Sequence, residues 1–192
     1  MKIAIFASGS GTNAENIIHY FSEKPQFQVA LVLANNPDAY VLQRAQKLHV
    51  PSCICTKSDF QNPEKILTIL DEYEIEFIVL AGFLLKVPEY LLKKFDSRIV
   101  NIHPALLPKY GGKGMYGDKV HEAVVAAGDT ESGITIHYIN EHYDEGDIIF
   151  QASCPVLPED TPHDVATKVH ALEYKYFPVV IEDVLQRITL NA

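Results

Sequence analysis

Short apolar runs alternate with segments of helical periodicity along the first half of the chain. The apolar runs, which predict strands, cover residues 2–7, 27–33, 53–55 and 77–80. The segments between them, in which apolar residues recur at offsets of three and four, cover residues 14–20, 40–48 and 64–73. Strands joined by crossover helices pair in parallel with right-handed connections. The pattern therefore predicts an α/β fold with a parallel sheet.

The second half is less regular but predicts three more strands and three helices. The strands cover residues 98–101, 134–139 and 147–156, and the helices residues 88–95, 120–127 and 161–186. A tight turn at Asp144–Gly146 would join the last two strands into a hairpin. Thr161 followed by Pro162 is typical of a helix start. With no linker or repeat, residues 1–192 are predicted to form one domain, with a largely parallel, seven-stranded sheet flanked by helices.

Composition and charge narrow the class of protein. Hydrophobic residues make up 47% of the 192 residues and the formal net charge is −9, so a globular core is expected and a nucleic-acid partner is not. The three cysteines form no disulfide framework, which favours a reducing compartment. The alternative is that Cys53 and Cys55 form half of a metal site. The N-terminus does not resemble a signal peptide and no apolar stretch suits a membrane span, so a cytoplasmic protein without membrane contact is expected.

A glycine-rich loop follows the first predicted strand and precedes the first helix. This arrangement offers backbone N–H groups and the positive end of the helix to a phosphate. Its candidate ligand residues are Gly9, Ser10, Gly11, Thr12 and Asn13. One alternative is a purely structural turn with Asn13 as the helix cap. A dinucleotide site would require a further glycine and an acid after the second strand, where the chain has Ala34–Asn36.

The segment Asn101–Pro104 lies at the end of the fifth predicted strand, where the ligands of open α/β sheets bind. Alternation along a strand places the side chains of Asn101 and His103 on one face, with Ile102 toward the core. An amide donor beside an imidazole suits acyl transfer, because the amide stabilises an oxyanion and the imidazole moves protons or shares that role. The alternative is a structural histidine before Pro104.

A carboxylate near such a histidine stabilises its protonated form, and Asp144 is the candidate. Glu141, Glu145 and Asp147 compete for that role, because spacing alone does not exclude them. His137 on the preceding strand could also face the site, and with His103 and Asp144 it would make a two-histidine, one-carboxylate metal set, an alternative to the metal-free interpretation. The remaining histidines, which we expect at the surface or in turns, are His19, His49, His121, His142 and His163.

Four motifs together resemble the phosphoribosylglycinamide formyltransferases. They are Ser8–Asn13, Leu80–Phe83, Asn101–Tyr110 and Asp144–Gly146. The Asn-Ile-His-Pro-x-Leu-Leu-Pro run is similar to that of enzymes that use 10-formyltetrahydrofolate, and the Gly-Ser-Gly-Thr-Asn loop to the glycinamide ribonucleotide branch. The resemblance covers nearly the whole chain. It implies a single α/β domain with a Rossmann-like N-terminal half that binds phosphate and a C-terminal half that binds folate and carries catalysis.

The resemblance also implies roles for residues. Asn101, His103 and Asp144 would be catalytic, and Gly11, Thr12 and Asn13 would hold the ribonucleotide phosphate. The remaining substrate contacts would be His170 and Glu173. The folate side would be formed by Leu84, Leu85, Lys86 and Val87, together with Asn101 and Asp144.

The chain departs from the family pattern on the folate side and in one loop. Leu85 and Lys86 replace an Arg-Ile pair, and no arginine lies near Pro63. Glu145–Asp147 follows the site aspartate where Gly-Gly-Pro is common, and the glycine-rich segment 111–117 is expected to be a mobile lid.

The implied activity is direct transfer of a formyl group from 10-formyltetrahydrofolate to the amine of glycinamide ribonucleotide, a step of de novo purine biosynthesis. No metal is expected, and the enzyme would be a monomer or homodimer. The alternatives are a formyltetrahydrofolate hydrolase, a methionyl-tRNA formyltransferase, a sugar-nucleotide formyltransferase or a catalytically silent ligand-binding domain. The hydrolase and the tRNA enzyme normally carry a further domain, which we do not expect here.

Overall fold

The computed structural model describes residues 1–142 and 144–191. The strands are β1 (Lys2–Ala7), β2 (Gln28–Ala34), β3 (Ser52–Ile54), β4 (Phe77–Leu80), β5 (Ile99–His103), β6 (Glu131–Tyr138) and β7 (Ile148–Pro155). The helices are α1 (Thr12–Phe21), α2 (Val41–Lys47), α3 (Pro63–Glu72), α4 (Glu89–Lys94), α5 (Asp118–Ala127) and α6 (Pro162–Leu190), with a 3₁₀ turn η1 at Asp59–Gln61. Every strand and helix expected from the sequence is present, with boundaries shifted by a few residues.

The strands form one seven-stranded sheet in the order β3-β2-β1-β4-β5-β6-β7. β1 pairs in parallel with β2 and β4, β2 pairs in parallel with β3, and β6 pairs antiparallel with β7. The predicted α/β class with a largely parallel sheet is therefore confirmed. The chain divides into two compact units, one of residues 1–100 and 184–192 and one of residues 101–183.

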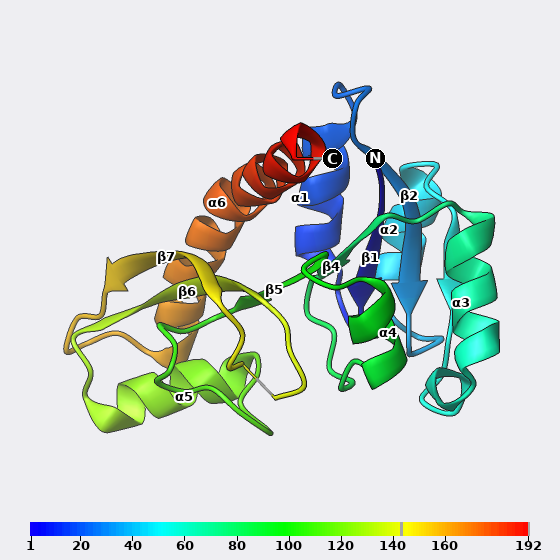
Figure 1. Cartoon of the computed structure of the whole chain (residues 1–192). Coiled ribbons are helices and arrows are strands. Elements are labelled where there is room, and N and C mark those ends of the chain that lie inside the picture. Colours follow the sequence, from blue (N-terminus) through cyan, green and yellow to red (C-terminus); the bar gives the residue numbers. More distant parts are fainter. Residues whose placement is uncertain (143, 192) are drawn as a thin grey trace. The chain divides into compact units, whose positions relative to one another are not determined.

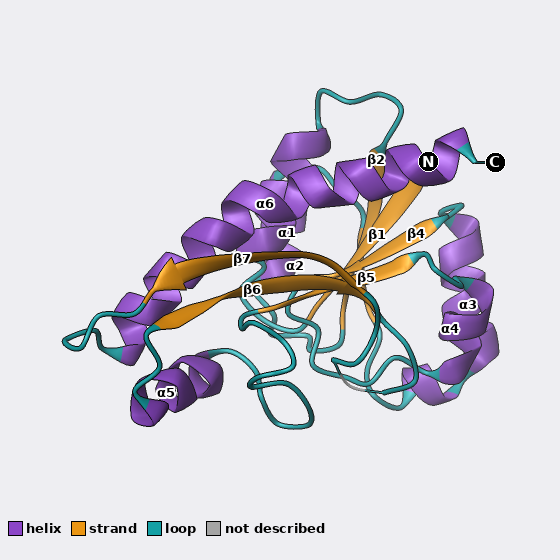
Figure 2. Cartoon of the chain, turned by 60° about the vertical axis from the view of Figure 1, so that its left-hand side comes forward, coloured by secondary structure: helices purple, strands orange, loops and turns teal. Residues whose placement is uncertain are grey.

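The first unit has a parallel sheet covered on both faces. Figure 2 shows α1 and α2 on one side of β1, β2 and β4, and α3 and α4 on the other, and Figure 1 gives the chain order. Because both faces are covered, the central strands are continuously apolar rather than alternating. Ile3, Ile5, Leu31, Leu33 and Phe77 are fully buried in this core.

The second unit is built on the β6–β7 hairpin, with α6 running along it (Figure 2). The hairpin pairing is confirmed, but the predicted tight turn at Asp144–Gly146 is only the last part of a longer connection over residues 139–147. Gly146 lies so close to β6 that an added Cβ would be 1.8 Å from the Tyr138 carbonyl oxygen, which only glycine permits. None of the helices in the described part of the chain is long and apolar enough to cross a membrane.

The start of α6 is capped as its sequence predicts. The Thr161 hydroxyl accepts a hydrogen bond from the Asp164 N–H at 3.3 Å, and the Thr161 N–H donates to the Asp164 carboxylate at 2.9 Å. This reciprocal pair satisfies N–H groups that the first turn of a helix leaves without partners. The helix continues four residues beyond its predicted end at residue 186, to Leu190.

Candidate active site

The glycine-rich loop joins the end of β1 to the start of α1 in the first unit. The helix is capped by Gly11, in a left-handed conformation with φ +74°. Asn13 is therefore the second residue of the helix, and the alternative that it serves as the N-cap is wrong. Because the cap is a glycine, the N-cap residue has no side chain to bond the first N–H groups of α1, which suits an anion site.

The predicted folate segment, Leu84 to Val87, lies in the same unit as this loop, between β4 and α4. Two hydrogen bonds connect the loop to the chain after β4. The Ser8 N–H donates to the Gly82 carbonyl at 3.0 Å, and the Ser8 hydroxyl accepts from the Leu84 N–H at 2.8 Å. Leu84 is 50% exposed and Val87 is buried, so the segment offers an apolar side chain to a ligand while remaining anchored.

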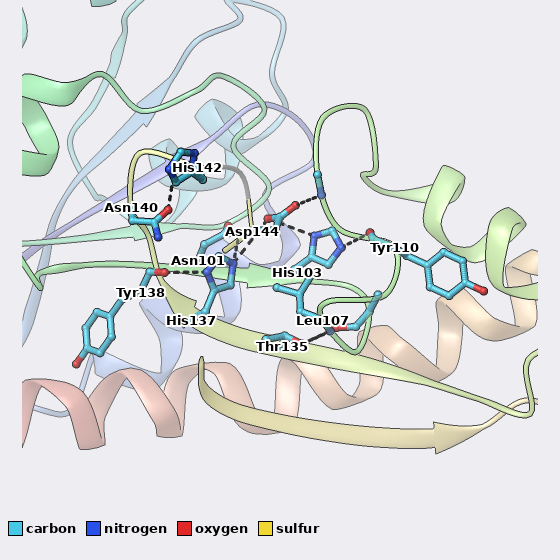
Figure 3. A network of polar contacts seen from close by, with 12 residues as sticks. Asn101, His103, Leu107, Tyr110, Thr135, His137, Tyr138, Asn140, His142 and Asp144 are labelled. Atoms are coloured by element: carbon cyan, nitrogen blue, oxygen red, sulfur yellow. Dashed lines mark hydrogen bonds and ion pairs between the residues drawn. The ribbon is translucent and has the colours of Figure 1, made fainter. Parts of the chain in front are cut away.

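Asn101, of the predicted catalytic set, contacts His137 in the second unit (Figure 3). The Asn101 amide nitrogen lies 3.1 Å from His137 Nε2, and His137 Nδ1 lies 2.8 Å from the Tyr138 carbonyl oxygen. A carbonyl only accepts, so Nδ1 carries the proton and Nε2 of the neutral ring accepts from the amide. Burial lowers the pKa of His137 and so keeps the ring neutral. The hydrogen bond to the Tyr138 carbonyl and the charge of Asp144 oppose this effect only in part.

His103 is the last residue of β5 and is almost fully buried. The strand begins one residue later and ends two residues later than the predicted 98–101, so His103 belongs to it. Its Nε2 lies 2.7 Å from the Tyr110 carbonyl oxygen and must donate to it. The other nitrogen, Nδ1, faces Asp144 with 3.7 Å to Oδ1. Nδ1 is therefore the nitrogen that can act in chemistry.

Asp144 faces both histidines, as Figure 3 shows. Its Oδ1 lies 3.7 Å from His103 Nδ1 and 3.8 Å from His137 Nε2, while Oδ2 accepts a hydrogen bond from the Gly112 N–H at 2.8 Å. Of the acids that competed for this place, Glu141 pairs with His142 instead. The structure thus brings together the three side chains predicted to be catalytic. The distances to the two histidines exceed those of hydrogen bonds, which suits a carboxylate that exchanges a proton through water.

The segment after His103 is held by a buried hydroxyl that the sequence did not indicate. The Thr135 Oγ1 donates to the Ala105 carbonyl at 2.7 Å and accepts from the Leu107 N–H at 3.0 Å. The Gln151 amide donates to both Thr135 Oγ1 and the Leu107 carbonyl, at 2.8 and 3.1 Å. Three of these four hydrogen bonds join the hairpin to the segment that leads to Tyr110, the partner of His103, and the fourth holds Gln151 against Thr135. Alternation along the predicted 134–139 strand gave no signal for Thr135, because it places this residue on the face opposite Ile134 and Ile136.

His170 and Glu173 of α6, predicted to contact substrate, form a pair of their own. His170 Nδ1 lies 2.9 Å from Glu173 Oε2, and this hydrogen bond raises the pKa of His170. His121 of α5 lies beside them, with 6.3 Å between its ring centre and that of His170. The expectation that His121 is a surface or turn residue is wrong, because it is 1% exposed. Its place three residues before the buried Val124 was the available signal.

The predicted site residues thus fall into two groups. The glycine-rich loop and the folate segment lie in the first unit, and the catalytic set with His170 and Glu173 lies in the second. Within residues 1–142 and 144–191, no set of three His, Cys, Asp or Glu side chains could hold a metal ion, so the metal interpretation of His103, His137 and Asp144 gains no support.

The sequence model of the formyl transferase family matches residues 1–181. The chain belongs to this family. It is similar to the chloroplastic phosphoribosylglycinamide formyltransferase of Arabidopsis thaliana, with 39% identity over 94% of the chain, although it spans only 64% of that relative's length. It is also similar to the phosphoribosylglycinamide formyltransferase of Bacillus subtilis, with 34% identity over 96% of the chain and 94% of the relative.

Solved structures agree with these sequence relatives. The crystal structure of phosphoribosylglycinamide formyltransferase from Anaplasma phagocytophilum matches with a TM-score of 0.88 and 32% identity, covering 97% of this chain and 88% of that one. The resemblance drawn from the four motifs is therefore confirmed, and so is the fold that it implied.

Proposed function

We propose that this formyl transferase family member transfers the formyl group of 10-formyltetrahydrofolate to the amine of 5-phosphoribosylglycinamide, a step of de novo purine biosynthesis. The single observation that carries the proposal is the cluster of Asn101, His103 and Asp144, with Asp144 Oδ1 3.7 Å from the imidazole. The names of the relatives from Arabidopsis thaliana and Bacillus subtilis support the same reaction.

The donor set fits formyl transfer. The Asn101 amide uses one N–H for His137, and its second N–H is available to an oxyanion. His103 Nδ1, in the imidazolium form, donates to the same oxygen. Asp144 accepts the proton of the attacking amine and passes it through water to the departing folate nitrogen. The folate supplies the one-carbon group, and the chain supplies orientation, charge and proton transfer without a metal.

Substrate positions follow from the same proposal. The backbone from Gly9 to Asn13 holds the ribonucleotide phosphate, and His170 with Glu173 contacts the same substrate. Leu84 to Val87, with Asn101 and Asp144, forms the folate side. A cytoplasmic location, a monomeric or dimeric state and the absence of nucleic-acid partners complete the proposal.

The test is to supply glycinamide ribonucleotide and 10-formyltetrahydrofolate together and separately, and to measure formylated product and tetrahydrofolate. Product that forms only when both are present is the expected result. Release of tetrahydrofolate without the ribonucleotide would instead identify a formyltetrahydrofolate hydrolase. No consumption of either compound would contradict the proposal and favour a silent ligand-binding domain.

A further inference from the structure

Helix α2 holds two successive carbonyl groups of the glycine-rich loop. The Val41 N–H donates to the Gly9 carbonyl at 3.1 Å, and Arg44 Nε donates to the Ser10 carbonyl at 2.8 Å. In a trans peptide the C=O and the following N–H point in opposite directions. The N–H groups of Ser10 and Gly11 therefore point away from α2. Successive N–H groups with a common direction form a concave site for an anion.

Val41 also determines how closely α2 approaches this loop. A Cβ placed on Gly11 would be 2.4 Å from a Val41 methyl group, so only glycine permits the contact. The position of Arg44, one helical turn after Val41, follows from this packing. The guanidinium thus reaches the loop from a fixed helix and not from a mobile chain end.

Arg44 also pairs with Glu15 in the first turn of α1. The side chains of Arg44 and Glu15 are only 21% and 33% exposed, so solvent screens this pair incompletely. A carboxylate so near the start of α1 opposes the binding of a second anion there, and the arginine compensates its charge. Arg44 is further held over the ring of Tyr40, 4.9 Å from its centre.

We propose that Arg44 is a positioning residue for the phosphate of the substrate. It acts through two neighbours: it directs the Gly11 N–H toward the anion by holding the Ser10 carbonyl, and it neutralises the carboxylate of Glu15. This inference rests on the proposed function for the identity of the ligand, but its geometry belongs to the loop, α1 and α2.

The experiment compares Arg44→Gln and Arg44→Lys with the unmodified chain. Steady-state kinetics give kcat and the KM of each substrate, and inorganic phosphate serves as a competitive inhibitor. Losing a charged hydrogen bond weakens an interaction roughly tenfold or more. We expect Arg44→Gln to raise both the KM for glycinamide ribonucleotide and the Ki for phosphate by about that factor, with kcat and the KM for the folate unchanged. Arg44→Lys retains the charge without the planar fork and should lie between the two.

Lys47→Gln is the matched control. Lys47 lies on the same helix and over the same Tyr40 ring, 5.8 Å from its centre, but its contacts there are to the tyrosine and not to the loop. It removes one positive charge from α2, as Arg44→Gln does. Equal increases of Ki in both variants would overturn the proposal, because a general charge effect would then suffice.

The double variant Glu15→Gln/Arg44→Gln separates the two parts of the role. The double variant should bind phosphate more tightly than Arg44→Gln, because it lacks the opposing carboxylate of Glu15. It should still bind phosphate less tightly than the unmodified chain, because nothing holds the Ser10 carbonyl. No recovery would contradict the role of Glu15. A parallel increase of both KM values, together with a lower midpoint of urea unfolding, would reduce Arg44 to a structural residue.

The outcomes also distinguish this inference from the proposed function. Phosphate binding can be measured by calorimetry on the unmodified chain without any turnover. If the chain forms no formylated product but phosphate binds and Arg44→Gln weakens it, the activity is wrong and the positioning role stands. If turnover is normal and phosphate inhibits both proteins equally, the activity stands and the positioning role is wrong.

Discussion

The side-chain amide of Asn101 donates a hydrogen bond to Nε2 of His137, across 3.1 Å. Because His137 Nδ1 is committed to the Tyr138 carbonyl, the ring presents only a lone pair to the amide. The amide therefore has one orientation, with its nitrogen toward His137. A neutral histidine that carries no charge into the reaction thus determines where the donor of Asn101 points.

Replacing Asn101 by alanine should remove one oxyanion donor. The loss of a single donor of this kind typically lowers kcat by about 10²–10³. We expect that decrease in kcat, with the KM for glycinamide ribonucleotide little changed and a normal urea unfolding curve. Asn101→Asp, which retains the shape but has no N–H, should be as poor as the alanine variant. An aspartate variant with near-normal turnover would show that the amide donates nothing to the reaction.

His137 should act on the rate only through Asn101. His137→Gln can place an amide oxygen near the position of Nε2, whereas His137→Asn is too short to accept from Asn101. Misplacing a catalytic group by about 1 Å can cost about 10²-fold. We expect kcat of the asparagine variant to fall by up to that factor and kcat of the glutamine variant to fall less. If both variants lose activity equally, the hydrogen bond to Asn101 is not the reason for the loss.

The buried hydroxyl of Thr135 provides a test of how the catalytic segment is supported. Thr135→Val keeps the shape but leaves the Leu107 N–H and the Ala105 carbonyl without their partner, at about 1–3 kcal/mol for each buried group. Urea unfolding should show that loss of stability, and kcat should fall because the segment that ends at Tyr110 is released. Thr135→Ser retains the hydroxyl and should stay near the unmodified protein in both measurements.

The fold was predictable because local patterns and long-range pairing agree. β1 and β4 have the bounds that their apolar runs predicted, since strands covered on both faces read as uninterrupted apolar segments. The end of β5 was harder to predict, because polar His103 precedes a proline and the predicted strand stopped at Asn101, two residues too early. Asn101 and His103 are also the two site residues on this strand. Asp144 was predicted from the motif in which it lies, because spacing along the chain did not distinguish it from the neighbouring acids.

The supporting residues were not predictable, for a physical reason. Thr135 and Gln151 act through hydrogen bonds to backbone groups of a distant segment, and no local pattern marks such partners. His121 carries no sequence signal beyond its position relative to Val124. Gly112 was assigned to a lid, whereas its N–H holds Asp144; whether the 111–117 segment moves stays a prediction.

The His170–Glu173 pair predicts a pH dependence of stability. The pKa of His170 is raised above its ordinary value of 6.5 by Glu173, so the native protein binds more protons than the unfolded chain between these two values. The stabilisation is complete below about pH 6.5 and is lost as the pH rises through the raised folded-state pKa. Urea unfolding of the unmodified chain and of His170→Asn should therefore differ more at about pH 5.5 than at about pH 8.5.

The effect of His121 on the pH dependence of stability is opposite to that of His170. Burial and the neighbouring His170 lower its pKa, so its protonation favours the unfolded chain as the pH falls below about 6.5. Both proteins in the comparison retain His121, so the difference between them reports the loss of His170 together with the release of its effect on the pKa of His121. A difference that grows with pH would contradict the assigned ion pair.

Gly9 and Gly11 of the glycine-rich loop should respond differently to substitution by alanine. At position 11 an alanine would have φ +74°, and its Cβ would lie 2.4 Å from a Val41 methyl group. A Cβ added at position 9 would have no atom within 4 Å. Overpacking alone costs about 1–3 kcal/mol, and the left-handed backbone adds to it. We expect Gly11→Ala to lower the free energy of unfolding by at least that amount and Gly9→Ala to change it by less than about 0.5 kcal/mol. Equal stability of both variants would mean that α2 can move away from the loop, and the fixed direction of the Gly11 N–H would then lose its basis.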